Sequence, residues 1–235
     1  IIAIDNYSKG IQGVRSEIPE FDMLALNVEA MAALDADVIF ASSMSDYEGK
    51  DLFKAIKDLG TTVVAIPSSE SIQGIKDDIA FIGQALQVTD KSQDLIENME
   101  AAIEEIAAIG ATIEDKKTVH FEISAAPYIY SFGTGTYLNE MIEIVGAKNI
   151  YGDQQGWLPI TEEVVIAANP DVILTSVNYI ENATDEIMNR PGWENVKAII
   201  NEDVYYINNE ESSQPCHYIV IALKQMAKAI YPDMY

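Results

Sequence analysis

The stretch Asn27-Val-Glu-Ala-Met-Ala-Ala-Leu-Asp-Ala-Asp-Val-Ile-Phe has a partner far along the chain, Thr161-Glu-Glu-Val-Val-Ile-Ala-Ala-Asn-Pro-Asp-Val-Ile-Leu. Each copy predicts a short helix, a polar turn and an apolar strand. Asp37 and Asp171, which align in the two copies, are 134 positions apart. A second echo, of residues 63–71 by residues 204–212, has an offset of 141. Two αβ units often resemble each other by chance. Here, however, the two offsets are nearly equal, which favours two matched halves of the chain with a cleft between them.

Strands alternate with helices along the whole chain, which predicts an α/β protein with parallel sheets and right-handed crossovers. The apolar runs at 63–66 and 172–174 are typical of strands buried on both faces of a sheet. Further strands are expected at 37–41, 118–123 and 204–207. Helices are expected at 27–34, 50–59, 69–86, 136–145, 161–168, 187–200 (interrupted at Pro191-Gly192) and 215–230.

One long helix is expected from Thr89, as its N-cap, to Ile109, because apolar residues form a single stripe with acids outside it. At 1.5 Å per residue it would extend about 30 Å. It separates the two halves, so we expect two lobes with parallel sheets joined by one long α-helix. The expected division is an N-terminal lobe at 1–87 that lacks its first elements, a linker helix at 88–115 and a C-terminal lobe at 116–235.

The composition excludes several classes of function. The net charge is −24, and no segment is basic, which argues against nucleic acid and against a polybasic membrane-docking face. No apolar run is long enough to span a bilayer. The chain has two histidines and one cysteine, too few for a Cys/His zinc site, and no metal site is expected.

Aromatic side chains follow several predicted strands, at the edge where open α/β sheets bind ligands. Flat aromatic walls suit a large, partly apolar ligand whose orientation a few polar groups fix. Trp157 lies in a loop just before a helix, and His217 is expected in the first turn of the last helix. The candidate ligand-binding residues are Tyr7, Met44, Tyr128, Tyr130, Trp157, Tyr179 and His217.

No catalytic motif is present: there is no Gly-x-Ser-x-Gly elbow, phosphate-binding Gly-rich loop or His-Glu-x-x-His. We therefore expect no catalytic residues and no enzyme activity. His120 lies in the middle of a strand and is expected to be a satisfied core residue. His217 is expected to have a structural capping role; the alternative is an axial haem ligand facing Met44.

Several segments together resemble one family over nearly the whole chain. They are Asn27-Val-Glu-Ala with the strand that follows, Leu59-Gly-Thr-Thr-Val-Val-Ala-Ile, Glu140-Met-Ile-Glu-Ile-Val-Gly-Ala-Lys-Asn-Ile, Asn169-Pro-Asp-Val-Ile-Leu and Pro191-Gly-Trp-Glu-Asn-Val-Lys-Ala. With the long helix, they resemble the substrate-binding proteins of iron-siderophore and cobalamin ABC importers.

The resemblance implies two Rossmann-like lobes with parallel sheets joined by one long α-helix. The protein would be an extracytoplasmic monomer, either a membrane-anchored lipoprotein or a periplasmic protein. It would hold a small-molecule metal chelate between its lobes and deliver it to an ABC transporter permease. No intrinsic cofactor is expected, and the transported ligand would be a corrinoid, a ferric siderophore or haem. Two features depart from the family. Its first strand and helix, expected before Ile1, are absent, and Gln214-Pro215 replaces a frequent Arg-Pro, which weakens the case for an anionic catecholate.

The family docks to its permease through an acidic residue on each lobe. Glu48 and Glu181 lie one position apart in the duplicated frame, and the resemblance makes them the docking candidates, with Asp46, Asp185 and Glu186 as neighbours that could substitute. Two alternatives stay open: a haem-binding protein of a haem importer that uses Met44 and His217, and an enzyme subunit of the nitrogenase-like αβ type. The second needs clustered cysteines, and the single Cys216 argues against it.

Overall fold

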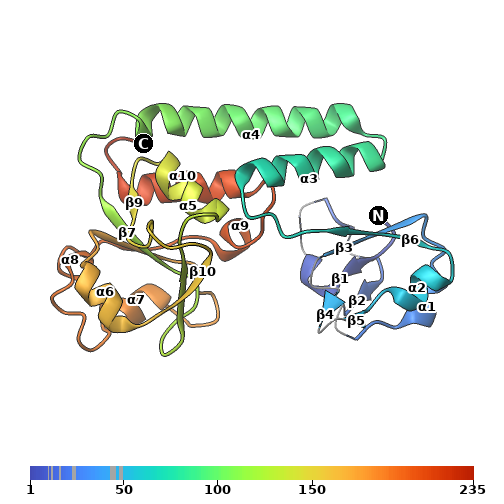
Figure 1. Ribbon diagram of the computed structural model, residues 1–235, viewed down its shortest axis with the longest axis horizontal. Helices are drawn as coiled ribbons and strands as arrows, with labels where there is room; N and C mark the ends of the chain where they lie inside the picture. The colour runs from blue at the N-terminus through green and yellow to red at the C-terminus, as the bar shows by residue number, and fades with distance from the viewer. Residues whose placement is uncertain (10, 12, 16, 23–24, 43–45, 48–49) are drawn as a thin grey trace. The chain divides into compact units, whose positions relative to one another are not determined.

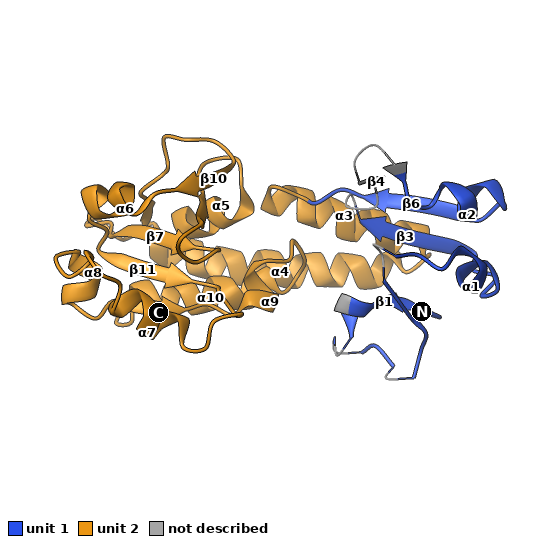
Figure 2. Cartoon of the chain, turned by 90° about the horizontal axis from the view of Figure 1, so that it is seen from below, with its two compact units in different colours: residues 1–68 blue, residues 69–235 orange. Residues whose placement is uncertain are grey.

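A computed structural model of the chain divides into two compact units, residues 1–68 and 69–235, blue and orange in Figure 2. The structure describes all residues except 10, 12, 16, 23–24, 43–45 and 48–49 (Figure 1). Within the described residues, no helix combines the length and the apolar character that a membrane span requires.

Among its described residues, the first unit contains three short strand pairs, two short α-helices and a short 3-10 helix. The pairs are β1 (Ile4–Asp5) with β2 (Glu20–Phe21), parallel; β3 (Val38–Ser42) with β6 (Thr62–Ile66), parallel; and β4 (Asp46–Tyr47) with β5 (Lys50–Asp51), antiparallel. The helices are η1 (Asn6–Ser8), α1 (Val28–Ala32) and α2 (Lys54–Asp58). Asn27 caps α1 by accepting a hydrogen bond from the backbone N–H of Ala30 at 3.0 Å.

Two expectations for the first unit were wrong in detail. The helix expected at 50–59 starts only at Lys54, because Asp51 Oδ1 accepts a hydrogen bond from the N–H of Phe53 at 3.0 Å, a turn that competes with helix. It ends at Asp58 with Leu59 as its C-cap, and Gly60, with φ of +99°, follows in the position where a terminating glycine was expected. Strand β6 is confirmed, but none of its residues is buried, since among the described strands it pairs with β3 alone.

The second unit is built on a four-stranded parallel sheet with strand order β12-β11-β7-β9. An antiparallel pair, β8 and β10, adjoins it, since the N–H of Ile123, just after β7, donates to the carbonyl of Tyr130 at 2.9 Å. The strands are β7 (Thr118–Glu122), β8 (Ile129–Phe132), β9 (Lys148–Asn149), β10 (Trp157–Ile160), β11 (Val172–Thr175) and β12 (Val204–Tyr206). Every residue of β11 is buried, as its continuous apolar run predicts.

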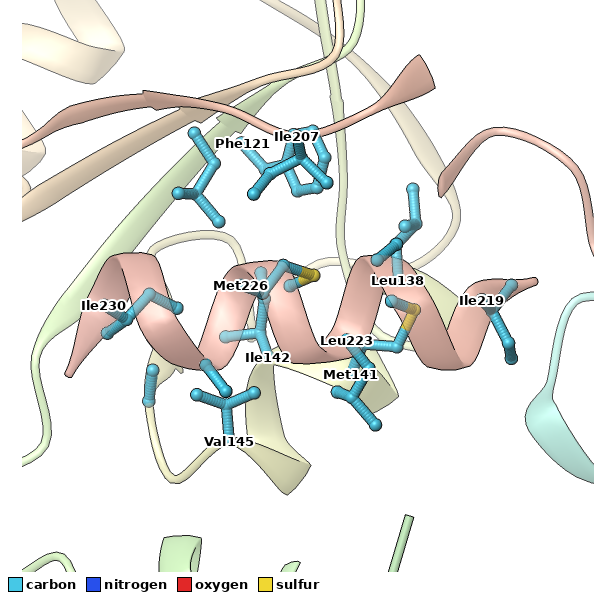
Figure 3. Close-up of a cluster of buried hydrophobic side chains, with 14 of the residues drawn as sticks. Phe121, Leu138, Met141, Ile142, Val145, Ile207, Ile219, Leu223, Met226 and Ile230 are labelled. Atoms are coloured by element: carbon cyan, nitrogen blue, oxygen red, sulfur yellow. The ribbon is translucent and has the colours of Figure 1, made fainter. Parts of the chain in front are cut away.

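Helices cover both faces of this sheet, which confirms the α/β class with a parallel sheet. In β7 and β11, Phe121 and Leu174 belong to a cluster with residues of α5 (Tyr137–Ile144) and α10 (Ile219–Ile230). Figure 3 shows Phe121 in this cluster. Ile173 belongs to a second cluster, with Val165 and Trp193. This alternation follows from the two-residue period of a strand. The helices are α3 (Ile72–Ala85), α4 (Thr89–Gly110), α5 (Tyr137–Ile144), α6 (Glu162–Ala168), α7 (Ala183–Met188), α8 (Lys197–Ile200), α9 (Asn209–Ser212) and α10 (Ile219–Ile230).

The long helix is confirmed as α4, of 22 residues, and it runs beside α3 (Figure 1). Its N-cap position is Val88, not Thr89, and no side chain caps it. Helices α3 and α4 belong to the second compact unit, where α4 also contacts α5 and α10. A lobe boundary at residue 87 and a separate linker at 88–115 stay predictions.

The last helix was expected to start at Pro215 but begins at Ile219. The residues before it form turns instead: the N–H of Cys216 donates to the carbonyl of Gln214 at 2.8 Å, and that of Ile219 to the carbonyl of Cys216 at 3.1 Å. His217 therefore precedes α10 and is not in its first turn.

Candidate functional site

The carboxyl ends of β7, β11 and β12 lie at one edge of the sheet, and the segments that follow them are tied together. The N–H of Ser176 donates to the carbonyl of Glu122 at 3.2 Å, and Asn209 Nδ2 donates to the carbonyl of Ser176 at 2.7 Å. The Tyr179 hydroxyl accepts a hydrogen bond from the N–H of Ala125 at 2.9 Å. Ligands of open α/β sheets bind at this edge, so these segments form the candidate site of the second unit.

Beside this edge, the β8–β10 pair presents an aromatic face. Trp157 pairs with Phe132, and Pro159 pairs with Tyr130. Side chains of directly paired residues, and those two positions apart, share a face, so Tyr130 and Trp157 are diagonal neighbours on one face. Trp157 meets Phe132 and Tyr137 edge-on, with ring centroids 6.1 and 6.4 Å apart, which fixes the orientation of the indole.

Four of the candidate residues from the sequence are exposed here, and we call them the aromatic set. Their exposed fractions are 79% for Tyr128, 42% for Tyr130, 42% for Trp157 and 66% for Tyr179. Exposed aromatic rings that lie near one another form an apolar surface of the kind that ligand sites use. Ligand binding by the aromatic set stays a prediction.

The other candidates are not brought to this site. Tyr7 belongs to η1 of the first unit, whereas Met44 and Glu48 lie outside the described residues. His217 is half-buried and its ring lies 4.1 Å from that of Tyr218, centroid to centroid; burial lowers its pKa, so its imidazole is neutral near pH 7. Glu181 is exposed in the turn before α7.

Below the site lies a buried polar network that the sequence reasoning missed. Arg190 donates two hydrogen bonds to Glu122, from Nη1 to Oε2 at 2.7 Å and from Nη2 to Oε1 at 3.0 Å. It also donates to Glu186 of α7, and its guanidinium lies 4.5 Å from the ring centroid of Trp193. A visible signal was the spacing of Glu186 and Arg190, four positions apart, at which opposite charges meet if the segment is helical.

His120 is fully buried beside this network, as expected for a core residue. Its Nδ1 is 3.0 Å from the Tyr151 hydroxyl, but Nε2 has no hydrogen-bond partner among the described residues, so the expectation of a satisfied histidine was wrong for that atom. Nε2 lies 3.8 Å from Glu122 Oε2, too far for a hydrogen bond. Both side chains lie on one face of β7, because they are two residues apart on the strand.

Burial and charge oppose each other in this network. Burial alone would raise the pKa of Glu122, but the two hydrogen bonds and the positive charge of the Arg190 guanidinium outweigh burial and hold that pKa below its usual range. Burial lowers the pKa of His120. Glu122 is therefore ionised and His120 neutral at pH 7, and the network is structural because every charge in it is paired.

A hollow of about 400 Å³ lies at the opposite edge of the sheet, where β7 and β11 begin. Its lining carries both signs of charge: Glu114, Asp115, Lys116, Lys117, Lys148 and Asp171. In the described part of the chain, no group of three or more His, Cys, Asp or Glu is placed to hold a metal ion. The aromatic edge is therefore the better candidate site.

Residues 1–211 match the family described as periplasmic binding protein, and the chain belongs to that family. Its members are binding proteins, not enzymes.

The relatives agree on class but differ in ligand. The chain is 28% identical over 233 residues to the uncharacterized ABC transporter substrate-binding lipoprotein YvrC of Bacillus subtilis, covering 98% of this chain and 72% of that protein. It is 26% identical over 212 residues to a cobalamin-binding protein of Halobacterium salinarum, covering 87% and 56%. The crystal structure of a "possible" iron-binding (periplasmic solute-binding) protein from Staphylococcus epidermidis superposes with a TM-score of 0.87 at 26% identity, covering 98% of this chain and 90% of that one.

Proposed function

We propose that this protein captures a bulky metal chelate, a corrinoid or a ferric siderophore, and delivers it to the permease of an ABC importer. The relatives support the transport role, since one is named as an ABC transporter substrate-binding lipoprotein and another as cobalamin-binding. The protein would act outside the cytoplasm, as a lipoprotein or a periplasmic protein. The expected cleft and the contribution of Tyr7 stay predictions.

The observation that carries the proposal is the exposed aromatic set at the carboxyl edge of the sheet. Rings of this kind bind large flat ligands through apolar contact and stacking. An intrinsic catalytic role is not needed to explain them.

Charge narrows the class of ligand. The segments after β7, β11 and β12, residues 123–128, 176–182 and 207–209, contain no Lys or Arg. Arg190 is buried and already paired with Glu122 and Glu186. A polyanionic chelate needs cationic partners, so these segments favour a corrinoid over a catecholate siderophore.

Fluorescence tests the proposal directly, because the chain has two tryptophans and Trp193 is fully buried. Dicyanocobinamide or cyanocobalamin at micromolar concentration should quench the emission of Trp157. Trp157→Phe should remove most of the quenching while calorimetric affinity changes little, because a ring remains. Trp157→Ala should weaken binding by about tenfold, in keeping with the loss of an aromatic contact of about 1–2 kcal/mol.

The same titration separates the alternatives. Quenching by a ferric hydroxamate but by neither corrinoid would favour a siderophore. A Soret shift with haemin that His217→Ala abolishes would favour haem. No response to any of the three would refute capture of a metal chelate.

Docking to the permease is proposed through Glu48 and Glu181, each paired with a cationic side chain of the permease. Glu181 is exposed and Asp185 beside it is exposed as well. Glu186, a neighbour that could substitute, already pairs with Arg190, which leaves it less available. Glu181 is therefore the first residue to test in the second unit.

A further inference from the structure

We infer that residues 176–182, which we call the strap, act as one rigid piece that links ligand binding at Tyr179 to docking at Glu181. The inference rests on the proposed function, because it takes the ring of Tyr179 as a ligand contact and Glu181 as a permease contact. Tyr179 is then a positioning residue through its hydroxyl as well as a binding residue through its ring.

The strap is held at its start by the backbone. Ser176 donates its N–H to the carbonyl of Glu122 and accepts a hydrogen bond from Asn209 Nδ2 on its own carbonyl, at 3.2 and 2.7 Å. Both neighbouring strand ends therefore hold Ser176. The first residue of the strap cannot shift unless these bonds break.

The middle of the strap is packed. Val177 and Ala183 are buried in a small cluster with Ala125, and Ile180 packs against it. This cluster is separate from the two larger clusters of the sheet. It fixes the strap to the segment that follows β7.

The Tyr179 hydroxyl completes the attachment. It accepts a hydrogen bond from the N–H of Ala125 at 2.9 Å and lies 3.2 Å from Ser124 Oγ. Ala125 is buried, and an unpaired buried N–H is costly. The hydroxyl is thus engaged in a hydrogen bond within the protein. The ring, which is two-thirds exposed, remains accessible to a ligand.

The strap thereby presents an aromatic ring and, two positions later, an exposed carboxylate. Between them lies Ile180, which is packed in the cluster. Ser176 is held by two hydrogen bonds, so the strap cannot move at that end. If an ion pair with the permease shifts Glu181, the shift must therefore displace Ile180 or the ring of Tyr179. Displacement of the ring removes one wall of the ligand, so docking and release would be coupled through this segment.

Tyr179→Phe tests the inference, since it keeps the ring and removes the hydroxyl. The amide of Ala125 should exchange its hydrogen about three to ten times faster, because its acceptor is lost. Dissociation of cyanocobalamin, followed by stopped-flow fluorescence, should also become about three to ten times faster. Tyr205→Phe is the matched control: it removes a hydroxyl that donates to Asp203 at 2.9 Å, outside the candidate site, and should change neither rate.

Each result decides one step. If the amide hydrogen of Ala125 exchanges at an unchanged rate in Tyr179→Phe, the proposed attachment of the strap is wrong, whether or not the protein binds a corrinoid. Faster exchange with unchanged dissociation would overturn its link to the ligand. Glu181→Ala should leave both rates unaltered in the isolated protein; faster dissociation would show that Glu181 contacts the ligand. If the unmodified protein binds no corrinoid, both the proposed corrinoid function and the proposed link between ligand binding and docking are wrong. The amide exchange of Ala125 would still decide whether the Tyr179 hydroxyl attaches the strap.

Discussion

Arg190 and Glu122 form a two-bond ion pair in the interior of the second unit, although 68 positions separate them in the chain. Glu122 ends β7, and Arg190 follows α7. The pair therefore fixes the position of α7 relative to the sheet. Because the strap leads into α7, the pair also supports the candidate site from below.

Arg190→Met should destabilise the second unit by about 3–5 kcal/mol, because it leaves the carboxylate of Glu122 buried without its partner. Urea unfolding followed by circular dichroism measures this loss. Lys197→Met is the control, since Lys197 forms a pair with Asp171 at 3.1 Å and its side chain is 55% exposed. That change should cost at most about 1 kcal/mol. Equal costs for the two variants would show that the buried pair has no special role.

The two histidines allow a direct test of the buried network by pH. Since burial lowers the pKa of His120, its NMR resonance should show a neutral imidazole below pH 6.5, where an exposed histidine is protonated. His120→Asn identifies the resonance, because His217 is the other histidine of the chain. A normal titration of His120 near pH 6.5 would contradict its placement in the core.

The same pKa shifts predict how stability depends on pH. The unfolded chain binds a proton at His120 below about pH 6.5 and the folded chain does not, so stability should fall as pH drops below that value, by at most about 1.4 kcal/mol per pH unit. The lowered pKa of Glu122 acts later: its stabilising effect is complete above its ordinary pKa and is lost as pH falls from about 4.5 through the folded value. Chemical unfolding from pH 7 to about pH 3 should show both effects. His120→Asn should reduce the slope below about pH 6.5, and His217, whose pKa burial also lowers, accounts for the remaining slope.

The fold was predictable wherever one segment carries its own signal. Helix α4 was predicted almost to the residue because 22 residues show one apolar stripe. Strand β11 was predicted because its apolar run is continuous. The β8–β10 pair was missed, since each strand has four residues and Pro159 argues against a strand. The early start predicted for the last helix came from treating Pro215 as a first-turn residue.

The site was predictable only in part, for a physical reason. Residues that follow parallel strands must share one edge of the sheet, so the positions of Tyr128 and Tyr179 followed from the strand pattern. What each side chain does at that edge depends on contacts between distant segments. The bond from Ala125 to the Tyr179 hydroxyl spans 54 positions, and no local pattern in the sequence encodes it.

The close approach of α4 to the end of α5 gives a prediction about packing. Gly146 has φ of +87°, and a Cβ there would lie 2.5 Å from the carbonyl oxygen of Gly110. Gly192 has φ of +88° with nothing within 4 Å of such a Cβ. Gly192→Ala should therefore cost about 1–2 kcal/mol from backbone strain alone. Gly146→Ala should cost about 1–3 kcal/mol more, because the two chain segments must separate; thermal unfolding of both variants measures the difference, and equal melting temperatures would contradict the close contact.

The docking proposed for Glu181 gives a prediction that concerns transport and not ligand affinity. Glu181→Ala should weaken the association with the permease by about two- to fivefold and reduce its dependence on salt, as expected when one exposed ion pair of about 0.5–1 kcal/mol is lost. Corrinoid uptake by cells that carry the importer should fall, while affinity for cyanocobalamin in solution stays the same. Glu105→Ala is the control, because Glu105 is an exposed acid on α4 and its removal changes the net charge equally. If both variants lower uptake to the same extent, the effect belongs to the net charge of −24 and not to a specific contact at Glu181.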